Sequence, residues 1–206
     1  MADKYDIAVV GATGAVGEVM FEILAERKFP VGKIYALASA RSVGKEVDFG
    51  RRSVVVDDLA EFDFSKVQIG LFSAGGSVSA EYAPQAVSAG CVVIDNTSHF
   101  RYDDDIPLVV PEVNPEAIAQ YEQRGIVANP NCSTIQMVVA LKPIYDAVGI
   151  ERINIELSTR NKLRMIEAVC VYLDGELPEL HTVVAGQAPD FEDSEEVRRI
   201  GEAKMA

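Results

Sequence analysis

The chain has 206 residues, of which 49% are hydrophobic and 25% charged, as in many soluble globular proteins. Its net charge of −13 argues against nucleic acid and anionic membranes as partners, because both would repel it. No apolar run approaches the roughly 20 residues of a membrane-spanning helix, and the charged N-terminus does not suit a signal peptide. Three cysteines in unrelated settings give no disulfide pattern, so we expect a cytoplasmic protein.

Short apolar runs alternate with segments of helical spacing along the first 150 residues. The predicted elements are, in chain order, a strand at 5–10, a helix that starts near Val16 and ends before Phe29-Pro30, strands at 34–38, 53–56 and 67–72, a helix at 80–89, strands at 91–94 and 108–110, a short helix at 115–122, a strand at 126–128 and a helix after Cys132. Buried strands alternating with helices predict an α/β fold, with a Rossmann-like, doubly wound, mostly parallel sheet.

A glycine-rich loop joins the first strand to the first helix. Gly11 permits a tight turn, Gly14 lets the backbone approach a pyrophosphate, and Gly17 lets the helix pack close to the strand. A pyrophosphate would lie on the N-terminus of that helix. The alternative is a loop that serves only as a turn. The predicted cofactor residues of this loop are Gly11, Thr13, Gly14, Ala15, Val16 and Gly17.

The end of the second strand discriminates between the two nicotinamide dinucleotides. An NAD site usually places an acidic residue there to bind the ribose 2′-hydroxyl. This chain has Ser39, Arg41 and Ser42 instead. A guanidinium flanked by hydroxyls suits a 2′-phosphate, so the predicted cofactor is NADP. The alternative for Arg41 is a solvated surface side chain.

Ser73, Ala74 and Gly75 follow the strand at 67–72, where doubly wound folds bind their ligands. Small side chains there leave room for the middle of the cofactor and for the nicotinamide. An ordinary Gly/Ser turn is the alternative.

Cys132 stands where a helix is expected to begin, after Asn129-Pro130-Asn131. Unpaired N–H groups and the positive end of the helix dipole favour the thiolate, which is the nucleophilic form. A small apolar residue in a helix cap is the simpler alternative. Cys91 and Cys170 are expected to be core residues, and no cluster of residues has metal-ligand spacing.

Three motifs occur in one order: Gly-Ala-Thr-Gly-Ala-Val-Gly, Ser-Ala-Gly-Gly-Ser and Asn-Pro-Asn-Cys-Ser-Thr. With Asp95–Arg101 and Val109–Asn114, they make the stretch from Tyr5 to Asn154 resemble the N-terminal part of aspartate-β-semialdehyde dehydrogenase. The resemblance implies reduction of L-aspartyl-4-phosphate to the semialdehyde with NADPH, on the route to lysine, methionine and threonine.

The resemblance also implies roles for individual residues. Cys132 would take the aspartyl group as a thioester and release phosphate, while Arg101 and Asn131 would bind that phosphate. The alternative for Arg101 is a surface ion pair with Asp103 or Asp104. The implied partners are thus an acyl phosphate or aldehyde and inorganic phosphate.

The likeness ends after Asn154. We expect an NADP-binding domain at 1–154 that carries the cysteine, and a short, divergent, α-rich tail at 155–206 in place of the family's substrate and dimerisation domain. The family dimer is therefore not assured, and exposed apolar surface would drive self-association. His181 is either a substitute base or an exposed tail residue. The predicted tail helices are one with an apolar face of Leu163, Ile166, Val169, Cys170 and Leu173, and an acidic one over Asp190–Ala203.

Two other functions remain open at this point. The chain could be an NADP-binding or interaction module without turnover. It could also act on N-acetylglutamyl phosphate, although the reductases for that substrate more usually have glycine where this chain has Asn131.

Overall fold

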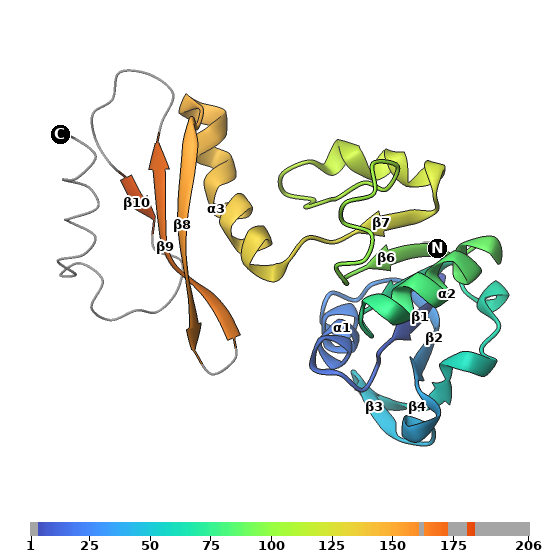
Figure 1. The fold of residues 1–206 in the computed structure, drawn as a ribbon. Coiled ribbons are helices and arrows are strands. Elements are labelled where there is room, and N and C mark those ends of the chain that lie inside the picture. Colours follow the sequence, from blue (N-terminus) through green and yellow to red (C-terminus); the bar gives the residue numbers. More distant parts are fainter. Residues whose placement is uncertain (1–3, 161–162, 173–180, 184–206) are drawn as a thin grey trace, which may run out of the picture. The chain divides into compact units, whose positions relative to one another are not determined.

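The computed structural model describes residues 4–160, 163–172 and 181–183. Contacts divide the chain into two compact units, a first that ends at Asn131 and a second that begins at Cys132 (Figure 1). The domain boundary predicted after residue 154 remains a prediction.

The first unit is built on one seven-stranded sheet with the order β3-β4-β2-β1-β5-β6-β7. All neighbouring strands are parallel except β3, which pairs antiparallel with β4 at one edge. The predicted Rossmann-like, doubly wound architecture is thereby confirmed. Its elements are β1 (Tyr5–Val10), α1 (Ala15–Glu26), β2 (Val31–Ala38), η1 (Ala40–Ser42), β3 (Glu46–Phe49), β4 (Arg52–Asp58), η2 (Leu59–Glu61), η3 (Phe64–Lys66), β5 (Ile69–Phe72), α2 (Gly76–Ser88), β6 (Val92–Asp95), η4 (Pro115–Gln123) and β7 (Ile126–Ala128).

The sheet is buried on both faces, as continuous apolar strands require. In β1, Ile7 and Val9 belong to the core cluster that contains Phe21 of α1. Ala8 and Val10 belong to the opposite cluster, which α2 covers. This two-layer packing explains why β1 shows no polar alternation: successive side chains enter different cores.

In the first unit, one predicted strand is absent from the structure, and one observed strand was not predicted. The segment at 108–110 is no strand but makes one isolated bridge, between Leu108 and Ala128. The edge strand β3 escaped prediction because its sequence, Glu-Val-Asp-Phe, is half acidic. Its burial follows that alternation, since Val47 is buried while Glu46 and Asp48 are exposed.

The second unit contains α3 (Cys132–Val148), β8 (Arg152–Arg160), β9 (Leu163–Tyr172) and β10 (His181–Val183). The three strands form an antiparallel sheet of order β10-β9-β8.

The helix predicted from Leu163 is wrong, because these residues form β9 and pair along β8. The pairing shifts where Glu156 faces Ala168 and Leu157 faces Ile166. Such a bulge inserts one residue, so the apolar positions no longer keep a period of two and imitate helical spacing. His181 lies in β10. Leu173 and the second predicted helix, Asp190–Ala203, lie outside the described residues.

Candidate functional site

The carboxyl ends of the parallel strands meet at one edge of the first unit, and most predicted site residues follow these ends. The glycine loop follows β1, Ser39–Ser42 follow β2, and Ser73–Gly75 follow β5. Ligands of doubly wound folds bind at this edge. The loops after β6 and β7 lead there as well, to Arg101 and to Asn129–Asn131.

Backbone hydrogen bonds hold the glycine loop against β2. The N–H groups of Gly11 and Ala12 both donate to the carbonyl of Leu37, at 2.9 and 3.2 Å. Gly11 has φ +89, a left-handed conformation that favours glycine. A Cβ on Gly17 would overlap the carbonyl oxygen of Gly11. Gly11 therefore makes the turn, and Gly17 gives the close helix packing that its place in the motif predicts.

The glycine loop also touches the loop after β5. A Cβ on Gly11 would lie only 2.9 Å from the backbone nitrogen of Ala74. Ser73 continues this contact, since its N–H donates to the carbonyl of Val10 at 2.9 Å. The two backbone segments thus form one continuous floor.

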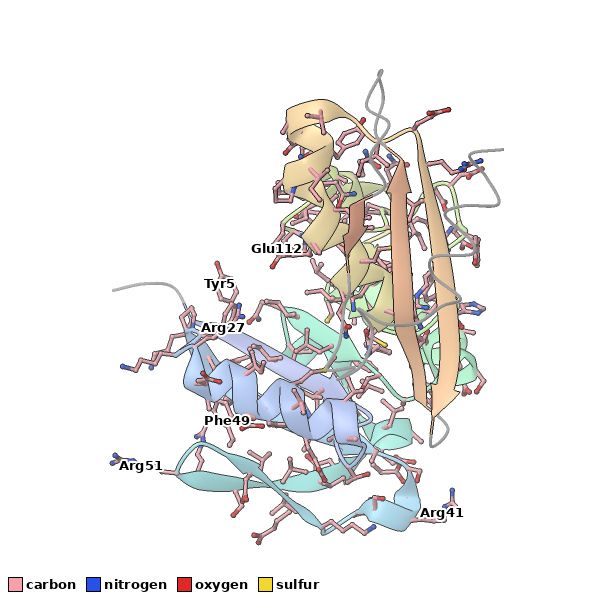
Figure 2. The ribbon with its side chains drawn as sticks, turned by 90° about the vertical axis from the view of Figure 1, so that its left-hand side faces the viewer. Tyr5, Arg27, Arg41, Phe49, Arg51 and Glu112 are labelled. Carbon is pink, nitrogen blue, oxygen red and sulfur yellow. The ribbon has the colours of Figure 1, made fainter. Side chains whose placement is uncertain are left out.

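A groove of about 690 Å³ lies over this floor. It collects the three predicted cofactor segments from separate parts of the sequence. The predicted residues that line it are Gly11, Thr13, Gly14, Ser39, Arg41, Ser42, Ser73 and Ala74. Four other predicted residues do not line it: Ala15, Val16, Gly17 and Gly75. Figure 2 shows Arg41 on η1, the short helix after β2.

Sequence reasoning missed the part of the groove formed by β4, η2 and α2. Asp58, Leu59 and Ala60 follow β4, whose carboxyl end lies at the same edge as that of β2. The predicted apolar strand at 53–56 could have indicated these residues, because the residues that follow any parallel strand beside β2 lie at this edge of the sheet. The α2 residues Val78, Glu81 and Tyr82 complete the lining, with the i, i+3, i+4 spacing of one helical face.

These residues fit a dinucleotide phosphate. Gly14 caps α1 without a side-chain hydrogen bond to the helix, so the backbone donors at this end can face a pyrophosphate. A guanidinium and two hydroxyls stand on η1 and beside it, where a 2′-phosphate would follow the ribose.

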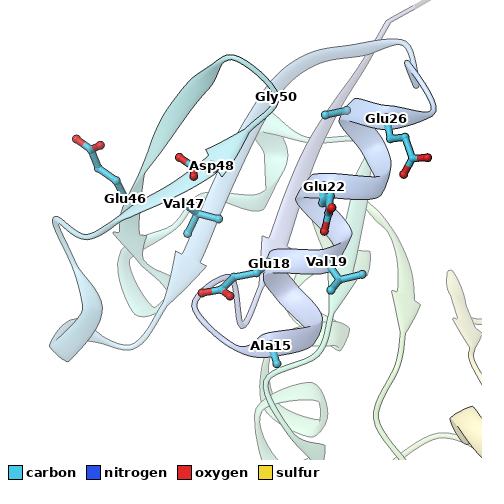
Figure 3. Close-up of a pocket in the computed structure, with 10 residues that line it drawn as sticks. Ala15, Glu18, Val19, Glu22, Glu26, Glu46, Val47, Asp48 and Gly50 are labelled. Carbon is cyan, nitrogen blue, oxygen red and sulfur yellow. The ribbon is translucent and has the colours of Figure 1, made fainter.

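A second groove, of about 970 Å³, lies between α1 and β3 (Figure 3). Acidic side chains dominate its lining, and Glu18, Glu22 and Asp48 are among them. Such a lining repels phosphates, and its described residues include no cationic side chain, whereas Arg41 lines the groove at the glycine loop.

Arg101 bridges the loops after β6 and β7. Its Nε donates to the carbonyl of Asn129 at 2.9 Å, and its Nη2 to the carbonyl of Asn96 at 3.0 Å. The side chains of these asparagines also pair, at 2.6 Å. Within the described contacts Arg101 pairs with neither Asp103 nor Asp104, in contrast to the surface alternative.

Asp95, the last residue of β6, connects α2 and the loops after β6 and β7 through hydrogen bonds. Its fully buried carboxylate accepts from the hydroxyls of Ser79 and Thr97, each at 2.7 Å, and from the N–H of Thr97 at 3.1 Å. Its carbonyl accepts from the N–H of Asn129 at 2.8 Å. A buried carboxylate is tolerated where hydrogen-bond donors surround it in this way.

The two described thiols differ in exposure. Cys132 is exposed and is the first residue of α3. Cys91 is 2% exposed, and burial raises the pKa of its thiol to about 12. Asn131, also exposed, precedes Cys132 and ends the first unit.

The described residues contain no group of three or more His, Cys, Asp and Glu side chains arranged to hold a metal. None of their helices combines the length and apolarity needed to span a membrane. The ring centroid of His99 lies 4.6 Å from that of Phe100, so His99 packs against this aromatic neighbour in its loop.

Comparison with known proteins gives relatives that are named aspartate-semialdehyde dehydrogenase. Over 155 residues the chain is 66% identical to aspartate-semialdehyde dehydrogenase 2 of Vibrio cholerae, a match to 75% of this chain and 46% of the relative. It is also 66% identical to the aspartate-semialdehyde dehydrogenase of Legionella pneumophila, again over 75% of this chain and 45% of the relative. The chain thus spans slightly less than half the length of these relatives.

Solved structures agree. A crystal structure of aspartate semialdehyde dehydrogenase II from Vibrio cholerae, complexed with ASA, matches with a TM-score of 0.73 and 66% identity, over 74% of this chain and 50% of the other. The Candida albicans enzyme with NADP matches with a TM-score of 0.62 and 27% identity, over 74% of this chain and 49% of the other.

The family described as semialdehyde dehydrogenase, NAD binding domain, matches residues 6–121. These residues include the glycine loop, η1 and the loop after β5, which together form the groove. The chain therefore belongs to the semialdehyde dehydrogenase family, through its NAD-binding domain.

Proposed function

We propose that the chain carries out the NADP-dependent reduction of L-aspartyl-4-phosphate to L-aspartate-4-semialdehyde, through a thioester on Cys132. The observation that carries this proposal is the groove on the glycine loop, in a chain 66% identical over 155 residues to an aspartate-semialdehyde dehydrogenase. The reaction belongs to the cytoplasmic synthesis of lysine, methionine and threonine.

The groove holds the dinucleotide. The backbone of Thr13 and Gly14, at the N-terminal end of α1, binds the pyrophosphate, and Arg41, Ser39 and Ser42 bind the 2′-phosphate that distinguishes NADP from NAD. Bound NADPH supplies the hydride that reduces the acyl group. The NADP in the Candida albicans structure supports this choice of cofactor.

Cys132 is the nucleophile. Its sulfur attacks the acyl carbon of aspartyl phosphate, and a carbon–sulfur bond forms. The bond between that carbon and the bridging oxygen of the phosphate group breaks, and phosphate leaves with the bonding electron pair. The exposure of Cys132 and its place at the start of α3 support this role.

Arg101 and Asn131 bind the phosphate. The hydrogen bonds from Nε and Nη2 of Arg101 to two backbone carbonyls fix the plane of its guanidinium. Its Nη1 makes no hydrogen bond among the described contacts and is suited to an oxyanion. Positioning an arginine by backbone carbonyls leaves its full charge for the ligand, because no carboxylate of the described residues forms an ion pair with it.

The reverse reaction tests the proposal. The purified 206-residue chain is mixed with aspartate semialdehyde, phosphate and NADP, and NADPH formation is followed by absorbance. We expect phosphate-dependent turnover that the Cys132→Ala substitution abolishes. We also expect Arg41→Ala to raise the KM for NADP about tenfold or more, without raising the KM for NAD. Turnover that survives loss of the thiol would refute the thioester.

A non-catalytic NADP-binding module is the second candidate. One observation favours it: the groove needs only residues between Gly11 and Tyr82. NADP binding without turnover, in the same preparation, identifies this function. Turnover on N-acetylglutamyl phosphate in place of aspartyl phosphate would instead identify the reductase for that substrate.

A further inference from the structure

One end of the cofactor groove lies beyond the residues assigned to the ribose phosphate. The order β5, β1, β2, β4 along the sheet places Ser73, the glycine loop, Ser39–Ser42 and Asp58–Ala60 in that sequence along the groove. Register fixes the last step, since Ala38 of β2 pairs directly with Asp58 of β4. A dinucleotide with its pyrophosphate on α1 and its ribose at η1 therefore places its base beside Asp58.

The walls at this end suit a flat ring. Leu59, only 7% exposed, belongs to an apolar cluster against which Val78 and Tyr82 pack, and all three line the groove. Aromatic and aliphatic side chains of this kind pack on the faces of a base. They distinguish neither one purine from another nor a purine from a pyrimidine.

Asp58 supplies the polar contact that can make this distinction. Its Oδ1 accepts from the N–H of Ala60 at 3.1 Å, which fixes the carboxylate at the start of η2. No described residue donates to Oδ2. A fixed carboxylate with one oxygen unused is a hydrogen-bond acceptor prepared for a donor on the ligand.

The negative charge of Asp58 indicates which kind of group on the ligand it contacts. A carboxylate beside a phosphate-bearing ligand weakens binding unless a donor compensates it, and the chain is already strongly anionic. The amino group of adenine is such a donor, and it projects from the edge of the base.

We propose that Asp58 reads the base of the dinucleotide by accepting a hydrogen bond from the exocyclic amine of adenine. The site then selects 6-aminopurine nucleotides over 6-oxopurine nucleotides. This inference rests on the proposed function only in requiring that the groove binds NADP.

Glu81 is the competing carboxylate, and the structure favours Asp58. Glu81 is exposed on α2. Burial, followed by the Glu81 and Asp58 carboxylates, raises the pKa of the Tyr82 phenol, which marks Tyr82 as a neighbour of both. Asp58 alone of these carboxylates is held by a backbone N–H in the described contacts.

The test compares NADPH with deamino-NADPH, in which hypoxanthine replaces adenine. Dissociation constants of the full chain are measured through nicotinamide fluorescence. We expect NADPH to bind about tenfold more tightly, the effect of one hydrogen bond to a charged group. In Asp58→Asn the amide oxygen still accepts from Ala60, but an NH2 group replaces the free oxygen and faces the 6-oxo group. The ratio of the dissociation constants of deamino-NADPH and NADPH should fall to about one or below.

Glu61→Gln is the matched control, because Glu61 carries the same charge on η2 but does not line the groove. It should keep the preference of the unaltered chain. Equal binding of the two nucleotides by the unaltered chain would overturn the inference while leaving the proposed function intact. So would a preference that Glu81→Gln abolishes and Asp58→Asn does not. Failure to bind either nucleotide would instead refute the proposed function itself.

Discussion

Two cysteines illustrate how far local surroundings, rather than residue type, decide chemistry. Cys91 precedes β6 and packs within the core cluster that lies beneath α2. Cys132 opens a helix and is exposed. Only the second can meet a substrate, although the two thiols are chemically the same.

The difference predicts selective alkylation. Iodoacetamide reacts with thiolates, and a thiol whose pKa is raised to about 12 stays protonated at pH 8. We expect Cys132 to be modified at pH 8 and Cys91 to remain unmodified until the chain unfolds. Peptide-resolved mass spectrometry measures both sites in one sample.

The same burial sets the sign of a pH effect on stability. Above the ordinary thiol value of 9.0, Cys91 ionises in the unfolded chain but not in the folded one, so alkali favours unfolding progressively up to about pH 12. Modification of native Cys91 at pH 8, at a rate matching Cys132, would contradict its assignment to the core.

At the scale of elements, the strand–loop–helix unit β1–α1 depends on contacts between backbones. Gly11 approaches the backbone of the β5 loop, and Gly17 approaches the carbonyl of Gly11. Neither neighbour is the end of a flexible side chain that could move aside. We therefore expect substitutions at different glycines of this loop to destabilise the fold by very different amounts.

We expect Gly17→Ala to lower the free energy of unfolding by about 2–3 kcal/mol, the usual cost of overpacking a tight contact. Gly14→Ala is the matched control within the same motif. Its Cβ would lie 3.3 Å from the Gly11 carbonyl oxygen, and its φ of −91 suits any residue. We expect a loss of about 1 kcal/mol or less there. Urea unfolding measures both, and equal losses would disprove the packing argument.

Elements with local signals could be predicted from the sequence. The strand at 126–128 has the predicted bounds, and the glycine loop lies between β1 and α1 as expected. The β9 error arose because a bulge is a property of a strand pair, which one strand's sequence does not contain. Asp58 was not predicted for a related reason. It lines the same groove as Arg41 only because β4 pairs with β2, and the sequence of either strand does not contain that pairing.

At the scale of the whole molecule, the groove proposed for the nucleotide lies within the first unit. All seven strands of its sheet end by Ala128, and the groove is lined by residues from Gly11 to Tyr82. This unit also has two core clusters of its own, one on each face of the sheet.

A shortened chain ending at Asn131 should therefore fold and bind NADPH with a dissociation constant within about twofold of the full chain, since no groove residue is lost. Fluorescence titration measures the affinity, and circular dichroism checks the fold. The same shortened chain with Arg41→Ala is the control for binding in the groove. A folded but non-binding product would show that the groove depends on residues after Asn131.

The peptide bond between Asn131 and Cys132 separates the last residue of one compact unit from the thiol that opens the next. In evolutionary terms the groove of the first unit and the helix that begins with Cys132 are separately inheritable. Recombination at that bond exchanges the chain from Cys132 onward without altering a single residue that lines the groove at the glycine loop.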